Sequence, residues 1–166
     1  KELGINSTKV IKFTDNTGTS INRLNEMSKL LLKFSKYLVN ENPDMVFLYG
    51  DRLESLIAAI SASNLNIPIS HFQGGDVSGN IDEKIRHSIT KLSDLHFASN
   101  SLSLKRILKM GEDKRTCFSI GDNHIDALKK INFSKSAFLK LNKKYKINAK
   151  NYIVFMLHPE SSSDYK

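Results

Sequence analysis

Side chains that can move protons or bind an anion follow the apolar runs of this sequence. Asp51 and Arg52 come directly after one run, Gln73 after the next, and His158 after the last. The carboxyl ends of parallel strands meet at one edge of a sheet, so we expect these side chains to lie along that edge. Carboxylates on separate strand ends, with an arginine nearby, can take separate acid and base roles. The spacing therefore predicts a ligand site at this edge of the sheet.

The stretch 70–94 joins one of these strand ends to a helix. Gly74 and Gly75 permit a positive φ and a close approach of the backbone to a ligand. Asn80 and Glu83 have the spacing of a capping box, which predicts that a helix begins there. A strand, a glycine turn and a polar helix start are how open α/β sheets build ligand sites.

Asp82 and Arg86 are four residues apart on this predicted helix, so the spacing places them on one face. They could contact a ligand. They could equally form a surface ion pair, with Asp82 and Glu83 only complementing the helix dipole. The same helix carries a predicted buried stripe of apolar residues, Ile81, Ile85, Ile89 and Leu92.

Apolar runs and helical periodicities alternate along the whole chain. This alternation is typical of an α/β fold with a parallel sheet. The predicted strands are 9–13, 45–49, 67–72, 95–98, 116–120 and 152–157. The predicted helices are 20–40, 52–64, one that begins at 81, 101–110, 125–131 and 134–146.

Composition bounds the class of protein. A chain of 166 residues with 40% hydrophobic residues suits one domain of ordinary size. The net charge is +8, but the lysines are spread along the chain, which argues against a nucleic-acid partner and suits an anionic small substrate. No run approaches the ~20 apolar residues of a membrane span. Cys117 is the only cysteine, which fits a reducing compartment. We expect a cytoplasmic protein without a membrane partner.

Four motifs carry a resemblance to a known family: GDR at 50–52, HFQGGDVSGNIDEKIRHSITKLSDLHF at 71–97, GDNHIDAL at 121–128 and FMLHPE at 155–160. In this order they resemble the UDP-N-acetylglucosamine 2-epimerases, and most closely the hydrolysing branch that supplies precursors of sialic and legionaminic acids. The resemblance implies a Rossmann-like parallel sheet with helices on both faces, within a GT-B-like enzyme of two domains. It makes residues 1–148 part of the first domain. Residues 149–166 become the first strand and His-Pro turn of the second, so that the enzyme would extend beyond both ends.

The resemblance also implies roles for individual residues. The implied catalytic residues are Asp51, Asp82, Arg86 and His158. The implied substrate-binding residues are Arg52, Gln73, Gly74, Gly75 and Ser78. Gln73 departs from the family pattern, because many members have glutamate there and an amide cannot transfer a proton as a carboxylate can. We expect Gln73 to bind sugar hydroxyls, or to mark a sub-branch that uses a different amino sugar.

The implied reaction has two stages. UDP leaves C1 of a UDP-amino sugar as the C2 proton is removed, and water then adds to the glycal to release a manno-configured amino sugar, such as N-acetylmannosamine or its 2,4-diacetamido analogue. The reaction needs proton-transfer groups on opposite faces of the sugar and no metal or other cofactor. A homodimer or homotetramer is implied. Two alternatives stay open: a non-hydrolysing epimerase, and a nucleotide-sugar-binding domain without catalysis.

Several candidates also have a structural interpretation. Asp51 could cap the helix that follows its strand, and His158 could be an interior histidine. His71 and His96 lie on predicted strands, and we expect both to be packed in the interior. His87 follows the arginine of the central helix and could reach the site or only the surface.

Overall fold

The computed structural model describes residues 11–12, 20–131, 134–146, 153 and 155–157. The chain divides into two compact units, Lys1–Ile120 and Gly121–Lys166. The first unit holds the sheet and the polar residues of the central stretch. The second unit contains the helices α5 (Asn123–Lys129) and α6 (Lys135–Tyr145).

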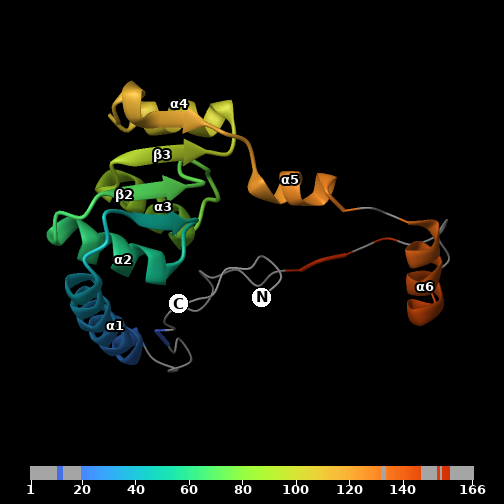
Figure 1. The fold of residues 1–166 in the computed structure, drawn as a ribbon, viewed down its shortest axis with the longest axis horizontal. Helices are drawn as coiled ribbons and strands as arrows, with labels where there is room; N and C mark the ends of the chain where they lie inside the picture. Colours follow the sequence, from blue (N-terminus) through green and yellow to red (C-terminus); the bar gives the residue numbers. More distant parts are fainter. Residues whose placement is uncertain (1–10, 13–19, 132–133, 147–152, 154, 158–166) are drawn as a thin grey trace. The chain divides into compact units, whose positions relative to one another are not determined.

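The first unit is built on a parallel sheet (Figure 1). Its described strands are β1 (Val46–Tyr49), β2 (Ile69–Phe72), β3 (Leu95–Ala98) and β4 (Cys117–Ser119), in the spatial order β1-β2-β3-β4. All three strand pairings are parallel, which confirms the predicted parallel sheet. The register aligns Tyr49 with Phe72 and Phe72 with Phe97, so the segments that follow β1, β2 and β3 leave the sheet at one edge.

Helices connect the strands close to the predicted bounds. They are α1 (Ser20–Glu41), α2 (Leu53–Asn64), α3 (Ile81–Leu92) and α4 (Ser101–Lys109), and a 3-10 turn, η1 (Lys114–Thr116), precedes β4. Helix α3 begins at the residue after Asn80, as the sequence predicts. No helix among the described residues combines the length and apolar character needed to cross a membrane.

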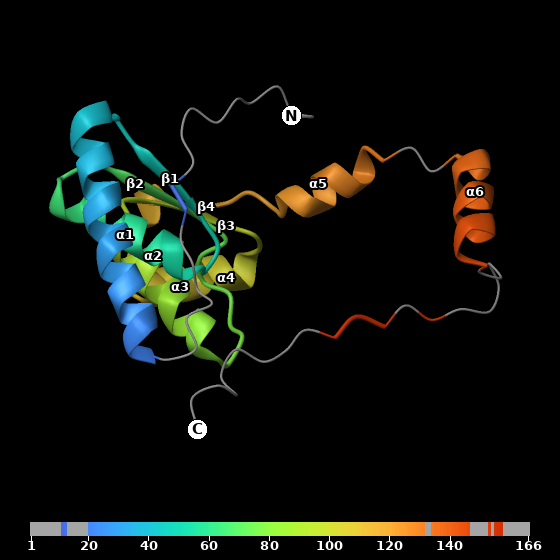
Figure 2. The same ribbon diagram turned by 90° about the horizontal axis from the view of Figure 1, so that it is seen from below.

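The described helices of the first unit lie on one face of the sheet (Figure 2). Strands that follow one another in space and in sequence, joined by right-handed crossovers, place their connecting helices on the same side. Leu48 and Ile69 pack with residues of α1, α2 and α3, while Ala98 and Cys117 pack with Ile107 of α4. The resemblance implies helices on both faces, and the described helices cover one.

Phenylalanine side chains form a row on the other face of the sheet. The rings of Phe72 and Phe97 stack with centroids 4.7 Å apart, and those of Phe97 and Phe118 with centroids 5.5 Å apart. The ring centroid of Phe47 lies 6.2 Å from that of Phe72, and Phe47 is 67% exposed. Strand alternation explains the two faces, because Leu48, beside Phe47, is buried under the helices.

Four predictions need correction or stay open. Ile81, the first residue of the predicted buried stripe, is 37% exposed, because it lies in the first turn of α3 at the edge of the core. The predicted strand at 9–13 lies largely outside the described residues, and residues 11 and 12 are not in a strand. Of the predicted strand at 152–157, the described residues 153 and 155–157 are not in a strand. The domain boundary at 148/149 stays a prediction.

Candidate functional site

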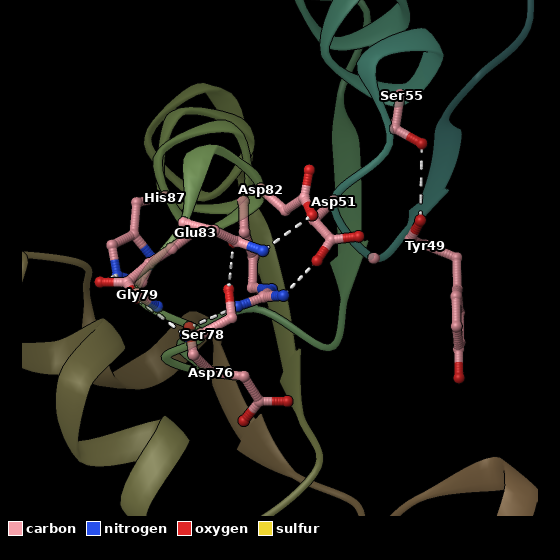
Figure 3. A network of polar contacts seen from close by, with 12 residues as sticks. Tyr49, Asp51, Ser55, Asp76, Ser78, Gly79, Asp82, Glu83 and His87 are labelled. Carbon is pink, nitrogen blue, oxygen red and sulfur yellow. Dashed lines mark hydrogen bonds and ion pairs between the residues drawn. The ribbon is translucent and has the colours of Figure 1, made fainter. Parts of the chain in front are cut away.

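Asp51 lies in a polar network at the carboxyl edge of the sheet (Figure 3), where it pairs with Arg86. Nη2 of Arg86, from α3, donates to Oδ2 of Asp51, which lies in the turn between β1 and α2. Nη1 of the same guanidinium donates to the carbonyl of Asp76 at 2.6 Å. The side chain of Arg86 is 10% exposed and that of Asp51 is 30% exposed. The arginine therefore joins three segments from an almost buried position.

The burial of Arg86 argues against its interpretation as half of an exposed surface pair with Asp82. The i,i+4 spacing is satisfied, but the guanidinium reaches across to the end of β1, 35 residues away in sequence. The Asp82 carboxylate accepts a hydrogen bond from the Asn80 side chain at 3.2 Å. Burial explains the difference, since a buried guanidinium must satisfy its donors within the protein.

The start of α3 is held by Glu83. Its Oε2 accepts hydrogen bonds from the backbone N–H groups of Ser78 at 2.8 Å and Gly79 at 2.7 Å. These two bonds lower the pKa of Glu83 below its ordinary value. The prediction that the helix begins after Asn80 is therefore correct, since Asn80 is the N-cap residue. The predicted capping-box hydrogen bonds are wrong, because the Asn80 side chain makes no capping bond. The Asn80 amide instead contacts the Ser78 hydroxyl, at 2.8 Å, and Asp82.

The two glycines of the loop after β2 make room for protein atoms. A Cβ on Gly75, where φ is +81°, would lie 2.3 Å from the carbonyl oxygen of Ser103. A Cβ on Gly74 would lie 2.9 Å from the Thr90 hydroxyl oxygen. The sequence predicts a close approach to a ligand, and the structure shows a close approach of this loop to α3 and α4.

Gln73 occupies the left-handed region, with φ of 62°. A residue with a side chain is strained there by roughly 1–2 kcal/mol. Its backbone N–H donates to the carbonyl of Phe97 at 2.9 Å, which holds this conformation at the end of β2. Asn42, Asn66 and Lys146 have positive φ as well, and the predicted role of the Gln73 side chain in binding stays a prediction.

Asp76 fastens the loop to α4, and sequence reasoning missed this role. Its carboxylate accepts from the Ser103 hydroxyl and from the Ser99 hydroxyl at 3.3 Å. Arg106 of α4 donates to the carbonyl of Gly75 at 3.2 Å. Ser103 is 27 residues from Asp76, and the only signal in the sequence was that Asp76 belongs to the polar segment after β2.

The remaining predicted site residues are Ser78 and Arg52, which are exposed, and His158. Ser78 lies in the exposed loop before α3, near Glu83. The Arg52 side chain is 72% exposed and pairs with Glu54, whose pKa this bond lowers. His158 lies outside the described residues.

Asp51 does not cap the helix that follows its strand. The N-cap residue of α2 is Arg52 and has no side-chain capping bond, while Asp51 bonds to Arg86. His71 and His96 are buried, as predicted. Nε2 of His87, in the middle of α3, lies 3.8 Å from the carboxylate of Glu83, one turn earlier on the same helix.

The arrangement suits proton transfer near a bound anion. Asp51 is partly exposed and its Oδ2 is held by Arg86, which orients the carboxylate for a reacting atom. The arginine places a positive charge at the same edge, next to the Asp51 carboxylate. Among the described residues, no group of three or more histidine, cysteine, aspartate or glutamate side chains could hold a metal ion.

Comparison with known proteins gives a consistent result. The family described as UDP-N-acetylglucosamine 2-epimerase matches residues 2–166. The chain is 39% identical over 130 residues to the UDP-N,N'-diacetylbacillosamine 2-epimerase (hydrolyzing) of Legionella pneumophila. The matched region covers 78% of this chain and 34% of that protein. It is 35% identical over 117 residues to the UDP-N-acetylglucosamine 2-epimerase of Neisseria meningitidis, over 70% of this chain and 30% of that protein. The chain thus spans about a third of the length of these relatives.

A solved structure shows the same fold. The UDP-N-acetylglucosamine 2-epimerase from Rickettsia bellii superposes with a TM-score of 0.72 at 22% identity, over 89% of this chain and 39% of that one. This likeness confirms the predicted Rossmann-like, GT-B-like fold class.

Proposed function

The chain belongs to the UDP-N-acetylglucosamine 2-epimerase family, and from this premise we propose that the full-length protein is a hydrolysing 2-epimerase of UDP-amino sugars. The observation that carries the proposal is the Asp51–Arg86 network at the carboxyl edge of the sheet, in a chain 39% identical to a relative named as hydrolysing. The name of that relative favours a 2,4-diacetamido sugar as substrate, with UDP-N-acetylglucosamine as the second candidate.

The first stage breaks the bonds at C1 and C2. A carboxylate takes the C2 proton, the electron pair forms the C1–C2 double bond, and UDP leaves from C1. We assign Asp51 to this proton transfer, since Arg86 contacts its Oδ2 and the other oxygen, Oδ1, can receive the proton. The C2–H bond is weakly acidic, so the base must be held in place, and the arginine supplies that constraint.

The second stage adds water to the glycal. The oxygen of water bonds to C1 and water gives up one proton to a basic group, while a proton from a donor is added to C2 from the opposite face, which inverts C2 and releases the free sugar. This second proton needs a donor on the other side of the ring, and we assign Asp82 or His158 to it. Gln73 binds sugar hydroxyls in this scheme, because its amide cannot carry the proton.

A non-hydrolysing 2-epimerase is the second candidate, because the Neisseria relative is named without hydrolysis. The two reactions differ in their products. Full-length protein is incubated with UDP-N-acetylglucosamine and with UDP-N,N'-diacetylbacillosamine, and products are separated by chromatography. Free sugar with stoichiometric UDP supports hydrolysis, whereas a UDP-sugar with inverted C2 supports the alternative. UDP binding without turnover of either sugar would leave a binding domain and contradict both.

Deuterium labelling tests the proton step directly. In D2O, the released sugar is expected to carry one deuterium at C2, because the original proton is replaced from solvent in every turnover. Asp51→Asn keeps the size and polarity of the side chain but removes the proton acceptor, so label entry and UDP release should fall together by at least roughly a hundredfold. Product without label from the wild-type enzyme would exclude epimerisation through C2. Near-normal turnover in Asp51→Asn would remove Asp51 from the reaction.

A further inference from the structure

His71 is buried at the centre of the sheet and bonded at both ring nitrogens. It lies on β2 and is 0% exposed. Its Nε2 lies 2.9 Å from the carbonyl oxygen of Gly50, and its Nδ1 lies 3.1 Å from the hydroxyl oxygen of Thr90, which is also 0% exposed. The imidazole therefore connects the end of β1 with the last turn of α3.

The partners of the ring define one tautomer. Burial lowers the pKa of His71 to about 4, so the ring is neutral at pH 7. A carbonyl oxygen only accepts hydrogen bonds, so the proton is on Nε2 and points to Gly50. Nδ1 is then an acceptor, and the hydroxyl of Thr90 donates to it. The hydroxyl oxygen of Thr90 also lies 3.1 Å from the carbonyl oxygen of Arg86. The hydroxyl has a single proton, and we assign it to the hydrogen bond with Nδ1 of His71, because that ring nitrogen carries no proton of its own.

Both partners of His71 stand next to the proposed site residues. Gly50 directly precedes Asp51, and Thr90 lies one helical turn after Arg86 on α3. The turn that carries the carboxylate and the helix that carries the arginine are thus linked twice, once by the ion pair and once by the buried imidazole.

The glycine loop leaves the space for this link. A Cβ on Gly74 would lie 3.1 Å from Nδ1 of His71 and 2.9 Å from the hydroxyl oxygen of Thr90. A side chain at this position would crowd the hydrogen bond between them. The absence of a side chain at Gly74 is thus part of the same arrangement.

We propose that His71 is a positioning residue, which fixes the Gly50–Asp51 turn against helix α3 so that Arg86 reaches the Asp51 carboxylate. It acts through these two residues, and its own ring is closed off from the substrate by burial. The effect on turnover rests on the function proposed above, but the effect on the Arg86–Asp51 pair does not.

The neighbouring strand provides a matched control. His96 on β3 is the register partner of His71 and is 1% exposed. Its Nε2 faces Glu112 at 3.4 Å, and neither of these residues is next to a proposed site residue. Loss of either histidine removes a buried imidazole from the same sheet, but only His71 is bonded to the segments that carry the site.

The test uses the full-length protein with His71→Leu, His71→Gln, Thr90→Val, Thr90→Ser and His96→Leu. UDP release gives kcat and KM for each folded variant. Arginine-selective 15N NMR, with the signal assigned from Arg86→Lys, reports the guanidinium held by Asp51. Imidazole 15N shifts report the tautomer of His71.

We expect His71→Leu and Thr90→Val to lower kcat roughly 10- to 100-fold with little change in KM, since a misplacement of about 1 Å at a reacting group has an effect of this size. Both should broaden or shift the Arg86 signal. Thr90→Ser keeps the hydroxyl, and the His71→Gln amide can still donate to the Gly50 carbonyl, so both should recover most of the loss. His96→Leu should lower stability and leave kcat and the Arg86 signal unchanged.

The outcomes separate the two proposals. Wild-type protein that releases no UDP from any tested sugar contradicts the proposed function, and the Arg86 signal then decides the role of His71 by itself. If His71→Leu does not fold, the pair Thr90→Val and Thr90→Ser decides. An unchanged Arg86 signal and kcat in Thr90→Val, equal losses of kcat in the His71→Leu and His96→Leu variants, or a neutral Nδ1–H tautomer would each overturn the proposal.

Discussion

Replacement of Arg86 by alanine tests the network at the site most directly, because stability and activity should fall together. The guanidinium is 10% exposed and donates to Asp51 and to the Asp76 carbonyl. Hydrogen bonds to charged groups contribute about 1.5–3 kcal/mol, and removal of one member of a fully buried ion pair costs roughly 3–5 kcal/mol. Asp51 is 30% exposed, so water can partly solvate the carboxylate that remains. We expect a loss of about 2–3 kcal/mol in the free energy of unfolding.

This loss should be visible in a thermal melt of the full-length protein. For a domain of this size, 1 kcal/mol changes the melting temperature by about 2–4 °C, so Arg86→Ala should melt roughly 5–10 °C lower. UDP release, measured below the melting temperature of the variant, should fall at least roughly a hundredfold, because the Asp51 carboxylate loses its constraint.

Arg52→Ala is the matched control. Arg52 is also an arginine paired with a carboxylate, but its side chain is 72% exposed. An exposed pair contributes about 0–1 kcal/mol, so the melting temperature of this variant should stay within roughly 2 °C of wild type. Equal melting temperatures for Arg86→Ala and Arg52→Ala would refute the buried network. Normal UDP release from Arg86→Ala would refute its role in catalysis.

Three further predictions concern the loop and the buried histidine. Gly75→Ala should cost roughly 2–5 kcal/mol in urea unfolding, because its Cβ would meet the Ser103 carbonyl at 2.3 Å, whereas Gly79→Ala has open space and should cost only the ~1–2 kcal/mol of its positive φ. Gln73→Gly should leave the melting temperature within about 2 °C, since relief of the strain at φ 62° offsets the entropy of glycine, while KM rises because a contact with the sugar is lost. The folded pKa of His71, about 4, lies below the unfolded value of 6.5, so the unfolded chain binds the extra proton and stability falls as pH drops from 6.5 towards 4. Urea unfolding at pH 7 and pH 5 should differ by roughly 2 kcal/mol from this residue, and this difference should disappear in His71→Gln.

The sheet and helices were predictable because their signals are local. The strand at 95–98 and the start of α3 at Ile81 have the predicted bounds, and the other described elements of the first unit differ by a few residues. Apolar runs mark buried strands, and polar residues after them mark the strand ends. The grouping of Asp51 with the segment after β2 at one edge of the sheet followed from the parallel topology alone.

The bonds within the site were not predictable, because they join residues far apart in sequence. The spacing of α3 places Asp82 and Arg86 on one face of the helix, but nothing local indicates that Arg86 donates to Asp51, 35 residues away. Nothing local in the sequence indicates that Ser103 would approach the loop closely enough to require glycine at position 75. The left-handed conformation of Gln73 could not be predicted from the sequence either, since glutamine is not a residue that indicates a positive φ.

Several residues that hold this site are more deeply buried than the proposed base. His71, Thr90 and Ser103 are 0% exposed, whereas the Asp51 side chain is 30% exposed. A buried hydrogen-bonded group is costly to change, because its partner is left unpaired, while a partly exposed side chain can be exchanged with smaller loss. If the proposed function holds, we expect that the preference for one amino sugar can be altered in the loop around Gln73 and Ser78 without disturbing the contacts behind it. Under the proposed function, a Gln73 variant should change the sugar that is used while the Arg86–Asp51 pair, and the proton step assigned to it, stay in place.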